Sequence, residues 1–190
     1  DAQESRGLGD VYKRQDKRLA AVDEAAKKVG AHVAMIGTLP TVTTDYLQSD
    51  EWMTPENRYA ALSNMVLEAR GELVHIDVSR QERYRATFDD IATESTCTSM
   101  QLHLQVAPDR FRDAWNASQA IAGVQVALGA NSPLFMGHRT WHESRIPVFK
   151  QSIDTRTAVL MNQDVRPRVW FGERWITSVF DLFEDCLLYT

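Results

Sequence analysis

The segment Thr96-Cys-Thr-Ser-Met-Gln-Leu-His-Leu-Gln-Val106 has the clearest periodicity in the chain. Apolar and polar side chains alternate along it; the apolar set is Met100, Leu102, Leu104 and Val106, and the polar set is Ser99, Gln101, His103 and Gln105. Because successive side chains of a strand point to opposite faces, this period predicts a strand with one polar face. We expect the apolar set to pack on the helix that follows, and the polar set to point together into a cavity.

The polar face of this predicted strand has two interpretations. A half-exposed antiparallel strand commonly has one solvated face, and that is the simpler interpretation. Solvated faces favour Lys, Glu and Thr, whereas this face carries amides and one imidazole. Such uncharged groups can line an enclosed polar funnel without the desolvation cost of a charge. The residues alone leave both interpretations open.

The rest of the chain reads as alternating helices and strands with glycine or proline at their ends. We expect helices over 16–29, 54–70 and 109–128, short strands over 31–39 and 73–78, an irregular segment over 131–162 and a strand-to-helix stretch over 172–185. The helix over 109–128 is apolar almost all round beyond Ala120, which predicts burial of that half. Irregular alternation of helices and strands predicts an α+β fold with an antiparallel sheet.

Composition narrows the class of protein. The 190 residues are 44% hydrophobic and 25% charged, with a net charge of −5, which is typical of a globular domain. The 21 Lys and Arg residues are scattered, so we expect neither nucleic acid nor an anionic membrane as a partner. The apolar run 121–130 is too short to span a bilayer. Cys97 and Cys186 suggest no disulfide framework, and we expect a soluble, cytoplasmic protein.

The two ends of the chain differ from its middle. The stretches 6–15 and 186–190 resemble translated sequencing adapters. We therefore expect 1–15 and 186–190 to be non-native and 16–185 to be the domain, as for any fusion scar. On this expectation Cys97 is the only native thiol. The alternative is an ordinary polar N-terminal tail and a natural final helix.

Two patterns in the irregular segment suggest binding chemistry. Arg145 and Arg156 are 11 positions apart, and they are either ordinary surface arginines or two guanidinium forks aimed at phosphate or carboxylate. His138 and His142 have the i, i+4 spacing of a helical metal site. Glycine and proline flank these histidines, which disfavours a regular helix and with it a zinc site.

Four segments in order resemble the plant and bacterial glutamate–cysteine ligases, members of the carboxylate–amine ligase group. They are Met53–Tyr59, Thr96–Gln105, Ala127–Pro133 and a final segment containing Ser144-Arg145 and Asp154-Thr-Arg156-Thr157. The resemblance runs from about 31 to 184. It implies a glutamine-synthetase-like catalytic domain, here 16–185 and partial, in which an antiparallel sheet forms a funnel with helices packed behind it.

The resemblance also implies a reaction with ATP and Mg²⁺ as cofactors. ATP would phosphorylate the glutamate γ-carboxylate, and the amine of cysteine would attack the acyl phosphate. Two alternatives stay open: the same chemistry with another amine acceptor, or an inactive binding module with the same fold.

Site residues follow from the same resemblance. Arg145 and Arg156 match family arginines expected to contact phosphate or a substrate carboxylate, as catalytic residues. Gln101 and His103 match positions in the metal and phosphate region, and Asn131 and Ser132 match a loop that lines the nucleotide or substrate side. Arg58 and Tyr59 match a substrate- or nucleotide-binding motif of unassigned role.

Magnesium prefers carboxylate oxygens to imidazole, so metal ligation and phosphate contact are both open for Gln101 and His103. The acidic metal ligands of such folds are expected on strands upstream of Asp16. We therefore expect the chain to be an internal piece of a longer enzyme, inactive when made alone.

Overall fold

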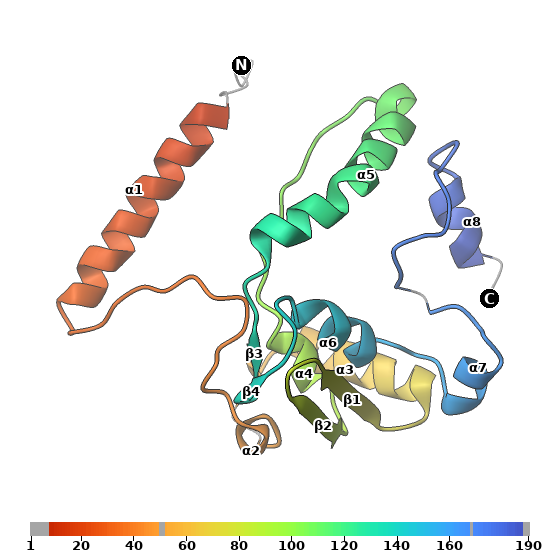
Figure 1. Ribbon diagram of the computed structural model, residues 1–190, viewed down its shortest axis with the longest axis horizontal. Helices are drawn as coiled ribbons and strands as arrows, with labels where there is room; N and C mark the ends of the chain where they lie inside the picture. Colours follow the sequence, from red (N-terminus) through yellow and green to blue (C-terminus); the bar gives the residue numbers. More distant parts are fainter. Residues whose placement is uncertain (1–7, 50–51, 168, 188–190) are drawn as a thin grey trace. The chain divides into compact units, whose positions relative to one another are not determined.

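The computed structural model describes residues 8–49, 52–167 and 169–187 of the chain (Figure 1). The chain divides into two compact units, Asp1–Met35 and Ile36–Thr190. The first unit contains one long helix. The second unit contains the hydrophobic core and every residue proposed above for a site.

The helix of the first unit is α1 (Leu8–Lys27). The predicted helix over 16–29 is confirmed, although it begins eight residues earlier than expected. Gly30 follows it with φ of +71°, a left-handed conformation that glycine adopts without strain. The prediction of a strand over 31–39 is wrong, because no described segment forms backbone ladder hydrogen bonds with these residues.

The core of the second unit is built on a two-stranded antiparallel sheet. Strands β1 (Val74–Ser79) and β2 (Arg83–Phe88) pair from Val74 opposite Phe88 to Ser79 opposite Arg83. Buried and exposed side chains alternate along both strands, so one face of the sheet is apolar. The strand predicted over 73–78 is confirmed.

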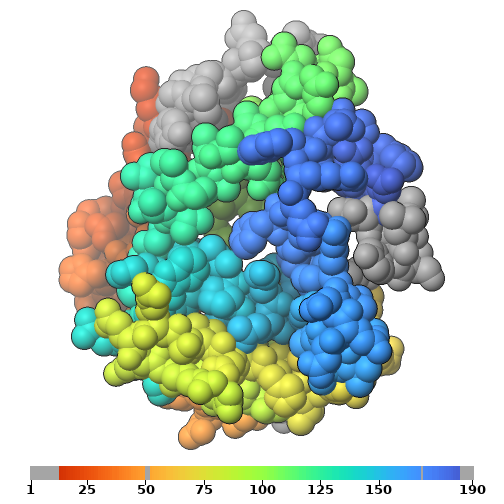
Figure 2. All heavy atoms as spheres, turned by 45° about the vertical axis from the view of Figure 1, so that its right-hand side comes forward, coloured from red at the N-terminus to blue at the C-terminus, as the bar shows by residue number. Residues whose placement is uncertain are grey.

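Helix α6 (Arg145–Ser152) packs on the apolar face of this sheet through the fully buried Val148. Figure 2 shows the α6 region, in blue-green, directly beside the yellow-green atoms of β1 and β2. Gln151 fixes the contact, because its side chain accepts from the backbone N–H of Asp77 at 2.7 Å and donates to the Asp77 carbonyl at 3.1 Å. These contacts fix the C-terminal half of α6 on β1.

Two further helices border α6. Helix α4 (Ala92–Ser95) contacts it, and the buried hydroxyls of Thr93 and Ser152 are 2.7 Å apart. Helix α3 (Asn57–Arg70) begins three residues after the expected Thr54 and ends at Gly71, whose φ is +65°. The predicted helix over 54–70 is therefore confirmed except for its first turn.

The segment expected to be irregular contains more regular structure than the pattern predicts. Strands β3 (Leu134–Phe135) and β4 (His138–Arg139) form a hairpin, and α6 and α7 (Ala158–Asn162) follow. The turn places Met136 and Gly137 at positive φ, as a two-residue hairpin turn requires. These elements are too short for periodicity to identify. Helix α2 (Thr44–Leu47) lies outside this segment and is a single helical turn, which is also too short for periodicity to identify.

Helix α5 (Phe111–Gly129) follows a 3₁₀ turn at Pro108–Arg110, which confirms the helix predicted over 109–128. Its predicted burial is wrong. Ile121, Val124 and Leu128 are 51%, 60% and 85% exposed, because no described element covers this half of the helix. The last helix is α8 (Asp181–Leu187), and the strand expected before it is not found over 172–180. No described helix combines the length and the apolar character that a membrane crossing needs.

The segment 96–106 is not a strand, and this is the main correction to the sequence-based fold. Met100, Leu102 and Leu104 are 73%, 82% and 78% exposed, so they do not pack on α5. Gln101, His103 and Gln105 are exposed as well, and do not point into a cavity. A strand needs a neighbour for its backbone N–H and C=O groups, and no described segment pairs with 99–106. Over the described residues the fold is α+β with two small antiparallel sheets.

Candidate functional site

Arg145 begins helix α6 at a point where three other segments meet. Its Nε and Nη2 donate to the two carboxylate oxygens of Glu143, at 2.6 and 2.5 Å. Its Nη1 donates to the Thr98 carbonyl at 2.7 Å. A guanidinium has five N–H groups, so one on each of Nη1 and Nη2 has no partner among the described residues. The side chain is 22% exposed, and these two N–H groups are the donors that its described partners do not use.

Glu143 is the centre of this arrangement and is only 5% exposed. Besides Arg145 it accepts a hydrogen bond from the Ser132 hydroxyl at 2.7 Å and another from the Asn131 backbone N–H at 3.4 Å. Burial raises the pKa of the Glu143 carboxyl, but the hydrogen bonds from Arg145 and Ser132 outweigh it and the pKa is lowered overall. Glu143 is therefore an anion with both oxygens satisfied.

Gly37 lies against the Arg145 guanidinium. Its N–H donates to the Asn131 carbonyl at 2.9 Å, and its carbonyl accepts from the Thr98 hydroxyl at 2.8 Å. A Cβ at this position would lie 2.7 Å from the Asn131 carbonyl oxygen and 2.8 Å from the Arg145 Cζ. Gly37 does not have positive φ, so what the position requires is space. We call Gly37, Thr98, Asn131, Ser132, Glu143 and Arg145 the Arg145 site.

Arg156 is held in the same way beyond the other end of α6. Its Nε and Nη2 donate to the carboxylate of Asp154 at 2.9 and 2.6 Å, and its Nη1 donates to the Val165 carbonyl at 2.6 Å. Each arginine is therefore paired with the acidic residue two positions before it. In both arginines Nη1 donates a hydrogen bond to a backbone carbonyl. The eight residues of α6 are about 12 Å long, and the two arginines lie at opposite ends of this helix.

Arg70 adds a third guanidinium, beside Asp154, and unlike the other two it is buried. It is 3% exposed, and its Nη1 donates to the carbonyls of Asp154 at 2.9 Å and Gln151 at 3.4 Å. Its Nε has no hydrogen-bond partner among the residues that the structure describes. Asp154 lies beside both Arg70 and Arg156. Burial raises the pKa of its carboxyl, but the hydrogen bonds from Arg156 and the positive charges of both arginines outweigh burial, so the pKa is lowered overall. Arg70 and Arg156 are therefore the two cations beside Asp154, and the Glu72 carboxylate accepts from the Ala158 backbone N–H nearby.

The other residues expected at a site lie elsewhere. Gln101 and His103 hydrogen bond to each other, with 3.3 Å between Oε1 and Nε2, and both are exposed. Arg58 and Tyr59 lie on α3, exposed, with the guanidinium 4.7 Å from the Tyr59 ring centre and 2.9 Å from its hydroxyl. Of the eight expected residues, the structure brings together Arg145, Asn131 and Ser132.

The histidine pair does not lie on a helix, as the flanking glycine and proline predict. His138 is on β4, its ring Nδ1 2.8 Å from the Met136 carbonyl, and His142 is in the turn before α6. Within the described ranges, no three His, Cys, Asp or Glu side chains gather where they could hold a metal ion. Gln101 and His103 offer one amide oxygen and one imidazole, which is not a donor set that suits Mg²⁺.

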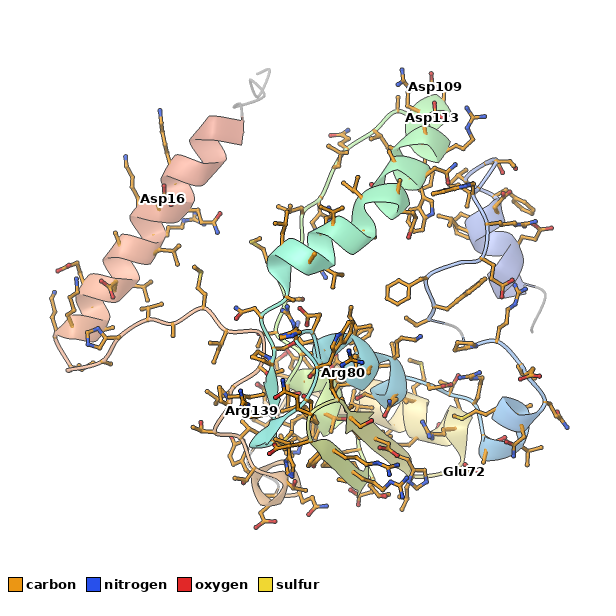
Figure 3. The ribbon with its side chains drawn as sticks, viewed as in Figure 1. Asp16, Glu72, Arg80, Asp109, Asp113 and Arg139 are labelled. Carbon is orange, nitrogen blue, oxygen red and sulfur yellow. The ribbon has the colours of Figure 1, made fainter. Side chains whose placement is uncertain are left out.

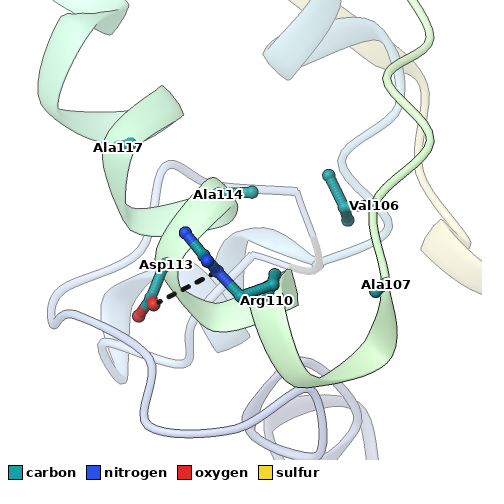
Figure 4. A pocket seen from close by; sticks show the side chains of 6 residues that line it. All are labelled: Val106, Ala107, Arg110, Asp113, Ala114 and Ala117. Carbon is teal, nitrogen blue, oxygen red and sulfur yellow. Dashed lines mark ion pairs between the residues drawn. The ribbon is translucent and has the colours of Figure 1, made fainter.

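Two surface hollows are separate from both arginines. The larger, of about 520 Å³, lies where the chain enters α5 and is lined by Val106, three alanines, Arg110 and Asp113 (Figure 4). Arg110 Nε is 4.0 Å from Asp113 Oδ2 there. The smaller, of about 230 Å³, includes Arg139 of the β3–β4 hairpin, which is labelled in Figure 3, and His142.

The sequence pattern draws attention to both arginines but not to Glu143, Gly37 and Thr98, which surround Arg145 in the structure. One signal for Glu143 was present: Glu143-Ser-Arg145 and Asp154-Thr-Arg156 share the pattern of an acidic residue, a hydroxyl residue and arginine. Gly37 had no signal, because its role depends on contacts with residues about a hundred positions away.

Comparison with known proteins gives one match. The model of glutamate-cysteine ligase family 2 (GCS2) matches residues 6–170. No curated protein and no solved structure matches the chain. The family match covers most of the chain, including all six residues of the Arg145 site, and this family suggests a carboxylate–amine ligase. The chain belongs to glutamate-cysteine ligase family 2.

Proposed function

We propose that this chain belongs to an ATP-dependent ligase that joins the γ-carboxylate of glutamate to the amine of cysteine through an acyl phosphate. The single observation that carries the proposal is the Arg145 site. Three of the four segments that resemble the family meet there, through Thr98, through Asn131 and Ser132, and through Arg145 itself. The proposed site is thus supported by packing as well as by sequence.

The chemistry requires neutralisation of charge. A carboxylate oxygen of glutamate forms a bond to the γ-phosphorus of ATP, and ADP leaves. The amine nitrogen then attacks the acyl carbon, phosphate leaves and the nitrogen loses a proton, giving the amide. Both steps develop charge on phosphoryl or carbonyl oxygens, which oriented N–H donors stabilise.

Arg145 fits the role of such a donor. Its Nε–Nη2 edge is taken by Glu143, which fixes the guanidinium plane before any ligand arrives. The remaining N–H on each of Nη1 and Nη2 can then donate to phosphate or carboxylate oxygens, a task for which arginine is better shaped than lysine. Arg156, fixed in the same way by Asp154, is proposed as the second anion-binding residue.

Gln101, His103, Arg58 and Tyr59 remain proposals as substrate- or nucleotide-binding residues. ATP is expected with Mg²⁺ in such ligases. Because the amide and imidazole of Gln101 and His103 do not suit Mg²⁺, we assign no ion to the described residues and no step to a metal.

The test is ADP release, measured with this chain and with the longest reading frame that contains it. The assay supplies ATP, Mg²⁺ and glutamate, with cysteine or one of a panel of other amines, and the product is identified by mass spectrometry. The proposal expects ADP and γ-glutamylcysteine in equal amounts. A different favoured amine would correct the acceptor and keep the ligase. No glutamate- and amine-dependent ADP from either protein would refute the proposal.

A further inference from the structure

We infer that Glu143 and Gly37 are positioning residues that together fix the Arg145 guanidinium, so that its two remaining N–H groups face an anionic group. The inference rests on the proposed function, and it assigns roles to two residues that the sequence did not single out.

Glu143 fixes the guanidinium in its own plane. Two hydrogen bonds to one edge, at 2.6 and 2.5 Å, leave little freedom for rotation about the Nε–Cζ bond or the last side-chain torsions. Glu143 is itself held by Ser132 and by the Asn131 backbone. The loop that follows α5 therefore fixes the orientation of Arg145 indirectly, because it holds the Glu143 carboxylate to which Arg145 binds.

Gly37 leaves the space that the guanidinium occupies. Its Cα faces Arg145 so closely that a Cβ would lie 2.8 Å from Cζ and 2.9 Å from Nε. Atoms that are not bonded do not approach so closely, so any side chain here would displace the guanidinium or the loop. The same Cβ would lie 2.7 Å from the Asn131 carbonyl oxygen, so it would also clash with the backbone of the loop after α5.

Substitutions at the two positions are expected to have different effects, because only Glu143 carries a charge. Glu143→Gln loosens Arg145 but also removes a negative charge beside it, so ground-state attraction for an anion does not fall. Gly37→Ala leaves all charges in place and moves the guanidinium. A positioning role therefore predicts that Glu143→Gln lowers kcat at least tenfold without raising the KM for ATP, while Gly37→Ala lowers kcat and raises that KM.

The direct test is the rate at which the Arg145 Nε–H exchanges with water, measured by nitrogen-15 NMR of the full chain. The Arg145 signal is assigned by its loss in Arg145→Lys. Exchange should be at least tenfold faster in Glu143→Gln and in Gly37→Ala than in the wild type. Arg156 is an internal control, because its own partner Asp154 is untouched in these variants. Gly123→Ala is the matched glycine control, since nothing lies within 4 Å of its Cβ position.

Inorganic phosphate is then titrated into the wild type and Gly37→Ala. The inference expects the Arg145 signal to shift in the wild type, with an affinity at least fivefold weaker in Gly37→Ala. Equal exchange rates in all proteins, no phosphate response in the wild type, or equal affinities would each overturn the inference. If Gly37→Ala does not fold, as loss of the Arg156 signal would show, the exchange rate in Glu143→Gln and phosphate binding to the wild type decide. An intact phosphate response without ligation would instead refute the proposed function alone.

Discussion

The carboxylate of Glu143 accepts both hydrogen bonds from the Nε–Nη2 edge of Arg145, with one donor on each oxygen. Asp154 does the same for Arg156 at the opposite end of α6. The chain therefore holds two arginines ready in fixed orientations, each with one edge used and donors left over. Such preorganisation is what a site needs to stabilise charge that develops only during reaction.

The ion pair of Glu143 and Arg145 should make stability depend on acid pH. The pKa of Glu143 lies below its ordinary value of 4.5, so the folded chain binds its proton less readily than the unfolded chain. The pair's contribution is therefore complete above pH 4.5 and is lost as the pH falls below it. Glu143→Gln should cost about 1–3 kcal/mol at pH 6 and clearly less at pH 3, measured by urea unfolding.

The matched control for this experiment is Glu68→Gln, which changes an exposed carboxylate on α3. It should show no such loss. A difference between wild type and Glu143→Gln that stays constant from pH 6 to pH 3 would contradict the lowered pKa.

Arg156 should act on the chemical step. Arg156→Ala is expected to lower kcat about 100-fold, and by far more than it raises the KM for glutamate, because a guanidinium on a transferring phosphoryl group acts mainly in the transition state. Steady-state kinetics on the longest active form provides the measurement. Arg166→Ala, which removes an exposed arginine paired with Glu173, is the control. A near-normal kcat would remove Arg156 from the site.

Cys97 should react slowly with alkylating reagents. Burial raises the pKa of its thiol to about 12, from an ordinary 9.0, so the thiolate fraction at pH 8 falls by a factor of about 1000. Iodoacetamide labelling followed by mass spectrometry of the Cys97 peptide should be at least 100-fold slower in the folded chain than in urea. Similar rates in both conditions would show that the thiol is accessible and ionised.

Two isoleucines distinguish the core from the exposed half of α5. Ile76 is fully buried in β1, whereas Ile121 is 51% exposed on α5. Ile76→Ala should destabilise the chain by about 2–5 kcal/mol, and Ile121→Ala by under about 1 kcal/mol. Equal losses in urea unfolding would mean that α5 is covered in solution, as its apolar sequence predicts.

Local signals in the sequence predicted α3 and β1 well. Gly71 ends α3 because it can adopt positive φ, and an apolar run after it forms the buried face of β1. The strand prediction for 96–106 is wrong because alternation of apolar and polar residues shows only that a strand could form. Whether it does form depends on a partner for its backbone, which no local pattern contains.

The same division holds for the site. Arg145 and Arg156 could be identified from residue type and spacing together with the family resemblance. The contact of Gly37 with Arg145 joins positions 108 residues apart, and only the folded chain brings them together. Glu143 is an intermediate case, because its spacing to Arg145 is visible but its burial is not.

The central claim is that Arg145 contacts the reacting anion, and ligation by Arg145→Lys tests it most directly. Lysine keeps the charge but cannot bind Glu143 through one edge and an anion through the remaining N–H groups. Glutamate- and amine-dependent ADP release by the longest active form should fall at least 100-fold in kcat, while unfolding in urea shows that the variant is folded. A folded Arg145→Lys variant with kcat within twofold of the wild type would contradict the claim.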